Sequence, residues 1–240
     1  MVFSDFYETA TAGFSNGIST QLANKLIVDS NTNSLTDLEK DDIVENAAFY
    51  YGKFLSALGV DWENDPNSKD TPKRVAKAYV HDLWAGRYSL LDNNTITTFP
   101  SDNYNGIILE KDIPIISMCS HHHQTILGKC HIAYIPQNDN ESQVLGLSKL
   151  NRIVNHFSRR GIIQEQLTVA IHNALNQILI GNAGILVIVH SFHNCVSCRG
   201  VRHIGTSMVT SEVSGVFSDH SKTAKAEVYS MISLQLDGYR

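Results

Sequence analysis

Two short segments of the sequence bring cysteine and histidine together at spacings that suit a metal ion. The first runs from Cys119 to His123 with the order Cys-Ser-His-His-His, and the second runs from Cys195 to Cys198 and follows His193. Zinc binds thiolate sulfur and imidazole nitrogen, and a Cys-x-x-His spacing lets both side chains of one turn reach the same ion. Four cysteines in a chain whose start resembles no export signal indicate reduced thiols rather than disulfides. We therefore predict one zinc site that uses both segments.

The ligand number decides what such a zinc ion could do. A closed site with four protein ligands would be structural, and its ligands would be Cys119, His122, Cys195 and Cys198. A site with three protein ligands keeps a water molecule that can become a nucleophile. Further histidines favour the open site, because reactions of such a water need nearby proton carriers; these are His121, His123 and His193.

Between the two segments lie residues that could bind an anion and a base. Lys149 and Arg152 are three residues apart, and Ser148 is predicted to cap the helix that carries them. Cations beside a helix N-terminus form a phosphate site, although a solvated basic face is the ordinary alternative. Three more cations, Arg199, Arg74 and Lys77, would complete a polyanion site if the fold brings them together.

Gln164 and Glu165 begin a further predicted helix. A carboxylate there can accept two N–H donors from the edge of a guanine, whereas a glutamate at a helix start more often serves the helix dipole. The sequence alone leaves both roles of Glu165 open.

The elements that must position these residues follow from hydrophobic periodicity. Helices are predicted from Leu38 to Leu58, from Thr71 to the stop at Gly86, and in two stretches with apolar faces around residues 147–157 and 167–178. Strands are predicted at residues 107–116, 125–135, 184–191 and 207–217, and an amphipathic segment at 223–234. The order predicts an α+β fold with an antiparallel sheet. Residues 1–36 are expected to be a flexible polar arm, 37–100 a helical segment and 101–240 the catalytic domain.

Composition excludes several classes of protein. The chain has 240 residues, 42% of them hydrophobic, and a formal charge of -5, which argues against general nucleic-acid binding. No apolar stretch is long enough to span a bilayer, and the start fits neither a secretory nor a transit peptide. We expect a cytoplasmic protein with no membrane role.

Read in order, the motifs resemble those of GTP cyclohydrolase I over roughly residues 40 to 237. The matching stretches are residues 71–76 (TPKRVA), the Cys-x-His-His core from Cys119, residues 144–150 (VLGLSKL), residues 164–168 (QEQLT), and the His-x-Cys-x-x-x-Arg-Gly run from His193 to Gly200. Each motif is weak alone, and the ordered set is specific.

The resemblance implies a site and a reaction. It implies zinc held by Cys119, His122 and Cys195, with Cys198 outside the site, and proton handling by His121 and His193. It implies that Gln164 and Glu165 anchor guanine. It also implies contacts to the ribose and triphosphate from Ser148, Lys149, Arg152, Arg199, Arg74 and Lys77. GTP and water would yield 7,8-dihydroneopterin triphosphate and formate.

The family fold is the tunnelling fold, a four-stranded antiparallel sheet with two helices on one side. The resemblance implies rings that stack as a homodecamer, with active sites between subunits. One position departs from the pattern, because Ser120 stands where the family usually has Glu and an additional His123 follows. Two alternatives stay open: a structural-zinc protein that binds a pterin or purine without turnover, and a hydrolase that stops at the formylated intermediate.

Overall fold

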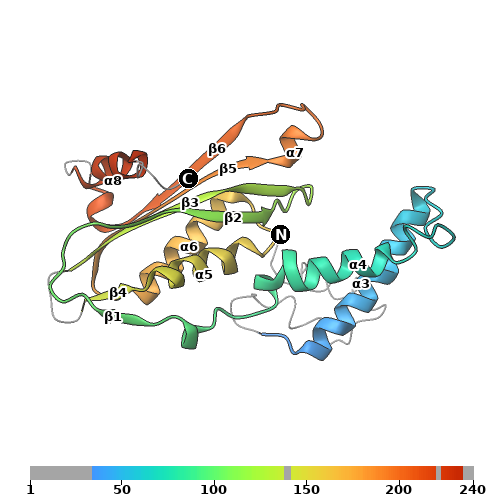
Figure 1. Ribbon diagram of the computed structural model, residues 1–240, viewed down its shortest axis with the longest axis horizontal. Helices are drawn as coiled ribbons and strands as arrows, with labels where there is room; N and C mark the ends of the chain where they lie inside the picture. The colour runs from blue at the N-terminus through green and yellow to red at the C-terminus, as the bar shows by residue number, and fades with distance from the viewer. Residues whose placement is uncertain (1–33, 138–141, 220–222, 235–240) are drawn as a thin grey trace, which may run out of the picture. The chain divides into compact units, whose positions relative to one another are not determined.

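The computed structural model describes residues 34–137, 142–219 and 223–234, and it divides into two compact units on either side of the Leu91–Asp92 bond (Figure 1). The predicted polar arm lies almost wholly outside the described residues. The predicted boundaries at residues 36 and 100 stay predictions, because compactness alone does not define a functional domain.

The first unit is helical. Its main helix, α3 (Asp37–Ala57), begins at a capping box, in which the Thr36 hydroxyl accepts the N–H of Glu39 and the Glu39 carboxylate accepts the N–H of Thr36. It is followed by α4 (Thr71–Lys77), the π-helical η1 (Ala78–Leu83) and the short η2 (Ala85–Arg87). These helices share a small core, which consists of Leu35, Ile43, Val44, Ala76, Val80 and Tyr88.

The second unit is built on a four-stranded antiparallel sheet with the order β2-β3-β5-β6. Its strands are β2 (Ile108–Met118), β3 (Thr125–Pro136), β5 (Asn182–His193) and β6 (Ser207–Val213). A separate pair, β1 (Thr98–Pro100) with β4 (Gln143–Leu145), was not predicted from the sequence. The mixture of helices with antiparallel sheets confirms the predicted α+β class.

Helices cover the two faces of this sheet unequally. The helices α5 (Leu147–Ser158) and α6 (Gln164–Ile178) lie together on one face, and α8 (Ala224–Ser233) covers one end of the other (Figure 1). The inner face and both helices contribute a fully buried core that includes Ile126, Ile132, Leu150, Ile153, Leu167, Ile171 and Val187. The remaining described elements are the short helices η3 (Asn93–Thr95), α7 (Asn194–Ser197) and η4 (Gly215–Phe217).

Away from α8, the outer face of the sheet is exposed and mixes apolar side chains with polar ones such as Lys129 and His190. Ile116 pairs with Leu127, and Leu127 pairs with Phe192, so the three side chains share that face across three strands. They are 62%, 46% and 49% exposed, and Val209 on β6 is 61% exposed. The row of exposed apolar side chains formed by Ile116, Leu127 and Phe192 is typical of a contact with another molecule. Within the described residues, no helix combines the length and the apolar character needed to cross a membrane.

Candidate metal centre

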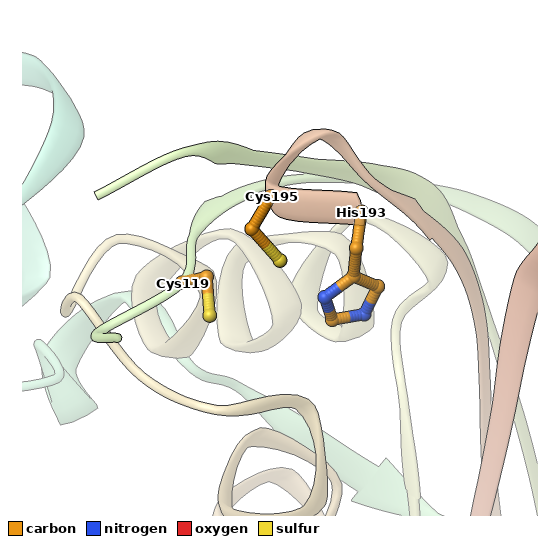
Figure 2. Close-up of side chains that lie close together, drawn as sticks. All are labelled: Cys119, His193 and Cys195. Atoms are coloured by element: carbon orange, nitrogen blue, oxygen red, sulfur yellow. The ribbon is translucent and has the colours of Figure 1, made fainter. Parts of the chain in front are cut away.

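Three side chains that could bind a metal meet at one end of the sheet. Cys119 directly follows β2, His193 is the last residue of β5, and Cys195 lies in α7. Their ligand atoms all lie within 4.8 Å of one another, and Figure 2 shows the three side chains close together, with one ring nitrogen of His193 on the side of the two sulfurs. In the described part of the chain, no other group of three or more His, Cys, Asp or Glu side chains meets this test. Two thiols and an imidazole are the donor set that zinc prefers.

The turn after β2 holds Cys119 through its backbone. The N–H of Cys119 donates to the carbonyl of Gln124 over 2.9 Å, and the N–H of His123 donates back to the carbonyl of Cys119 over 2.9 Å. His123 adopts a positive φ of 51°, which closes this turn. Cys119 itself is buried, so the turn delivers its sulfur to the inside of the protein.

The histidines of the same turn are exposed. His121 places Nδ1 3.8 Å from the Cys119 sulfur. The ring of His122 stands 6.4 Å from that of His121, centre to centre, and His122 does not join the cluster of ligand atoms. The structure therefore brings His193, rather than His122, close to the two thiols that the sequence predicted as ligands.

The turn that carries Cys195 is held by side chains as well as by backbone. The Ser197 hydroxyl shares its proton between the His193 carbonyl at 3.3 Å and Oδ1 of Asn194 at 3.1 Å. The thiol of Cys198 donates to the carbonyl of Asn194 over 2.7 Å and is exposed, outside the cluster.

Burial sets the electrostatics of the cluster. It raises the pKa of the Cys195 thiol, and the neighbouring Cys119 sulfur raises it further. Burial also lowers the pKa of His193, which the charge of Glu165 opposes. Both effects disfavour charge on the free side chains. A divalent cation would reverse this for the cysteines, because a metal binds the thiolate and releases its proton.

Gln164 is fully buried and bonded on all sides. Its Nε2 lies 3.0 Å from the Val189 carbonyl oxygen, 3.1 Å from that of Met208 and 3.1 Å from the Thr210 hydroxyl. Its Oε1 accepts from the Ser191 hydroxyl and lies 2.8 Å from Nε2 of His193. Gln164 therefore links α6 to β5 and β6, next to the cluster of ligand atoms.

Glu165 follows Gln164 on α6 but is exposed. Its negative charge acts to raise the pKa of His193. Arg199 is exposed in the loop after α7, and its charge counteracts the raised pKa of Cys195. Both residues therefore belong to the neighbourhood of the two thiols.

Three residues of the predicted phosphate site, Ser148, Lys149 and Arg152, lie on α5. The C-terminal end of α5 is fixed beside Cys119, because the Ser117 hydroxyl donates to the Ser158 carbonyl over 2.6 Å and the N–H of Ile162 donates to the Met118 carbonyl over 3.0 Å. Ser148 and Lys149 lie at the opposite end of α5, about 15 Å further along the helix axis. Arg152 is exposed on the same helix.

Ser148 was wrongly predicted as the N-cap of this helix. The helix begins at Leu147, with Gly146 as its cap, and the N–H of Lys149 donates to the Gly146 carbonyl over 2.8 Å. Gly146 has the extended φ of -63° and ψ of 142° that an N-cap needs, which leaves Ser148 inside the first turn. The other two predicted cations, Arg74 and Lys77, are on α4 of the first unit, where Arg74 forms an ion pair of 3.3 Å with Asp70.

Sequence reasoning missed the residues that surround Gln164. Ser191, Thr168 and Thr210 all bond to its side chain or to its backbone carbonyl. Only Thr168 carried a signal, because it lies four residues after Gln164 and so one helical turn away on the same face. Gly128 was missed as well; a Cβ there would collide with the His190 carbonyl and with Ser191, so only glycine lets β3 approach the site so closely.

Fold and cluster together define a class: an α+β protein with a candidate thiolate and imidazole metal centre at one end of an antiparallel sheet. Comparison with known proteins narrows this class. The sequence model of the family described as GTP cyclohydrolase I matches residues 48–233. The chain therefore belongs to the GTP cyclohydrolase I family, which confirms the resemblance noted in its motifs and the prediction that it is an enzyme.

Individual relatives agree. A protein named GTP cyclohydrolase 1 from Carboxydothermus hydrogenoformans is 38% identical over 181 residues, which cover 75% of this chain and 90% of that protein. One of the same name from Geobacillus kaustophilus is 40% identical over 181 residues, covering 74% and 90%. Among solved structures, an apo archaeosine synthase QueF-Like matches with a TM-score of 0.37 and 19% identity, over 46% of this chain and 94% of that one. A TM-score this low does not establish a shared fold.

Proposed function

We propose that the protein is a zinc-dependent GTP cyclohydrolase I, which converts GTP and water to 7,8-dihydroneopterin triphosphate and formate. The convergence of Cys119, Cys195 and His193 within 4.8 Å supports this most directly. It supplies a metal centre of the right donor chemistry beside an exposed carboxylate, Glu165, that can recognise a base.

Cys119, Cys195 and His122 would hold the zinc ion. The family resemblance favours His122 as the third ligand, and its place three residues after Cys119 suits a shared ion. Its side chain is exposed, so it can turn toward the sulfurs. Held by these three residues with one position open, the ion would supply a nucleophilic water for the hydrolysis of the purine at C8.

The chain's own residues would bind the nucleotide and move protons. Glu165 would accept the N–H groups at the guanine edge, since an ionised carboxylate accepts through both oxygens. His193 and His121, both beside the thiols, would carry protons during ring opening and the later rearrangement of the ribose. Arg199 would face the phosphates from the loop after α7, and Arg74 and Lys77 are proposed as further phosphate contacts in the assembled protein.

A second copy of the chain would complete the active site. Lys149 and Ser148 lie at the far end of α5 from the thiols, so one nucleotide meets both sets most simply if they come from different subunits. The exposed apolar surface of Ile116, Leu127, Phe192 and Val209 offers a face for such a contact. We therefore propose the tunnelling fold and a homodecamer of two rings, with no nucleic-acid or membrane partner and a place in the cytoplasm.

Subunit mixing tests the shared site. Cys195→Ser and Lys149→Ala copies should each be inactive alone, and they should regain part of the activity when unfolded together and reassembled. Regain is expected because some interfaces then combine an intact metal centre with an intact cation set. Lack of any regain in assembled mixtures would place both sets in one subunit.

The reaction itself is tested with purified, zinc-loaded protein and GTP. Formate release and pterin fluorescence after oxidation should rise together, and the Cys119→Ser variant should yield neither. Binding of GTP without formate would instead support the pterin- or purine-binding alternative with structural zinc. Loss of the purine absorbance without formate would indicate a hydrolase that stops at the formylated intermediate.

A further inference from the structure

Adjacent residues Gln164 and Glu165 occupy opposite environments at the start of α6. Successive residues of an α-helix point about 100° apart, so two neighbours seldom face the same partner. The Gln164 side chain is fully buried between α6 and the sheet, whereas Glu165 is exposed. A nucleotide that reaches Glu165 therefore does not meet the Gln164 amide.

The orientation of the Gln164 amide is fixed by partners that can play only one role. The carbonyl oxygens of Val189 and Met208 only accept, so the atom that faces them at 3.0 and 3.1 Å must be the NH₂ group. The amide oxygen then necessarily faces Ser191 and His193. Flipping the amide would place an oxygen against two carbonyl oxygens, which is repulsive.

Two threonines close the network behind the amide. The Thr168 hydroxyl donates to the Gln164 carbonyl over 2.9 Å and lies 2.6 Å from the Thr210 hydroxyl. Because its proton goes to the carbonyl, Thr168 accepts from Thr210. The Thr210 oxygen lies 3.1 Å from Nε2 of Gln164 and shares the two hydrogens of that nitrogen with the Val189 and Met208 carbonyls. The amide is therefore held by both β5 and β6.

This fixed oxygen determines which nitrogen of His193 carries the proton. A carbonyl-type oxygen only accepts, so Nε2 of His193 must donate over the 2.8 Å between them. In the neutral imidazole, Nδ1 is then the unprotonated nitrogen. Figure 2 shows the ring nitrogen next to the Cβ-bearing carbon, which is Nδ1, turned toward the sulfurs of Cys119 and Cys195.

We infer that Gln164 is a positioning residue for His193: it holds the proton on Nε2 and aims Nδ1 at the thiol pair, and it is not a guanine contact. The inference rests on the proposed function and divides the pair Gln164 and Glu165, which the family resemblance treats as one guanine anchor. Of the two residues, only Glu165 then contacts the guanine base, and the buried amide of Gln164 orients the imidazole of His193.

Kinetics with two nucleotides separate these roles. Gln164→Met keeps the length of the side chain and removes the acceptor, so kcat should fall about 10- to 100-fold, the usual effect of losing a group that orients a reacting imidazole. KM, zinc content and the preference for GTP over ITP, which lacks the 2-amino group, should stay unchanged. Glu165→Ala should instead lose that preference. Loss of the preference in Gln164→Met, or an unchanged kcat, would overturn the inference.

A second pair of variants changes the buried core less and tests the same role even if Gln164→Met does not fold. Thr210→Val removes one bond to the amide at nearly constant volume and should lower kcat with KM and zinc unchanged. Ser211→Ala, at the next position of β6 and on the opposite face, is the control and should change nothing. Equal behaviour of the two variants would contradict the positioning role.

The tautomer of His193 can also be measured directly, in an experiment that does not depend on GTP turnover. In protein labelled with ¹⁵N-histidine, solid-state NMR should show His193 protonated at Nε2 in the wild type, and a mixture of tautomers in Gln164→Met. The same mixture in both proteins would refute the inference even if GTP turnover is intact. Absence of turnover in the wild type would refute the proposed function and leave this result standing.

Discussion

The two turns that supply the thiols differ in how firmly they hold their histidines. The turn from Cys119 to Gln124 is closed by backbone hydrogen bonds, and its three histidines are exposed. The turn from His193 to Cys198 is braced by Ser197 and Asn194, and the His193 ring is bonded to a fully buried glutamine. We call the turn from Cys119 to Gln124 the adjustable turn and the turn from His193 to Cys198 the preorganised turn.

This difference suggests a division of labour. A histidine that must reach a metal benefits from a side chain that can turn, as His122 can. A histidine that must deliver a proton to a defined atom benefits from a fixed ring and tautomer, as in His193. Under the proposed assignment of His122, closeness to the sulfurs in the free protein would not decide which imidazole becomes the ligand.

The largest effect is expected within the preorganised turn. Cys195→Ser should lose both zinc and turnover, because removing one of only three protein ligands greatly lowers the affinity for zinc. Cys198→Ser should keep both, since that thiol is exposed and bonded to the Asn194 carbonyl. Metal analysis and formate release measure the two properties. If Cys198→Ser loses its metal as readily as Cys195→Ser, the site is closed and structural.

A second contrast lies within the adjustable turn. His122→Ala should weaken zinc binding strongly, whereas His123→Ala, its exposed neighbour, should leave zinc affinity within about threefold of the wild type. Competition with a chelator gives both affinities. The reverse order would move the ligand to His123, and full retention in both variants would favour His193 as the third ligand.

The smallest effect concerns Ser120, the position at which the motif departs from the family resemblance. Ser120→Glu returns a negative charge beside Cys119, so it should tighten metal retention or move the pH profile of turnover, with little change in thermal stability. Ser120→Gln is the neutral control of equal length. Identical behaviour of the two variants would show that charge at this position does not matter.

Local pattern predicted most of the elements, although the strand expected at 207–217 ends at Val213 and a short 3-10 helix, η4, follows it. The strand expected at 125–135 is β3, Thr125–Pro136, and the helix expected from Leu38 to Leu58 is α3, Asp37–Ala57. Alternation and helical spacing are properties of the chain itself, so they can be read before folding is known. The error at Ser148 arose because Gly146 has no side chain to signal a cap, although its backbone adopts the required conformation.

The candidate site could be predicted only in part. The cysteines were recognised from their spacing, but the inward direction of Gln164 depends on how α6 is rotated against β5 and β6, which no local pattern reveals. The separation of Lys149 from Cys119 likewise depends on the direction of α5 relative to the sheet. Such features belong to tertiary structure, where residues distant in sequence decide the outcome.

X-ray absorption at the zinc edge of the wild-type protein tests the central claim most directly. Sulfur and nitrogen ligands differ in distance, about 2.3 Å against about 2.0 Å, so their numbers can be counted. Two sulfurs, one imidazole and one light ligand that changes when GTP is added would agree with an open catalytic site. Three sulfurs, with a spectrum that GTP leaves unchanged, would contradict it.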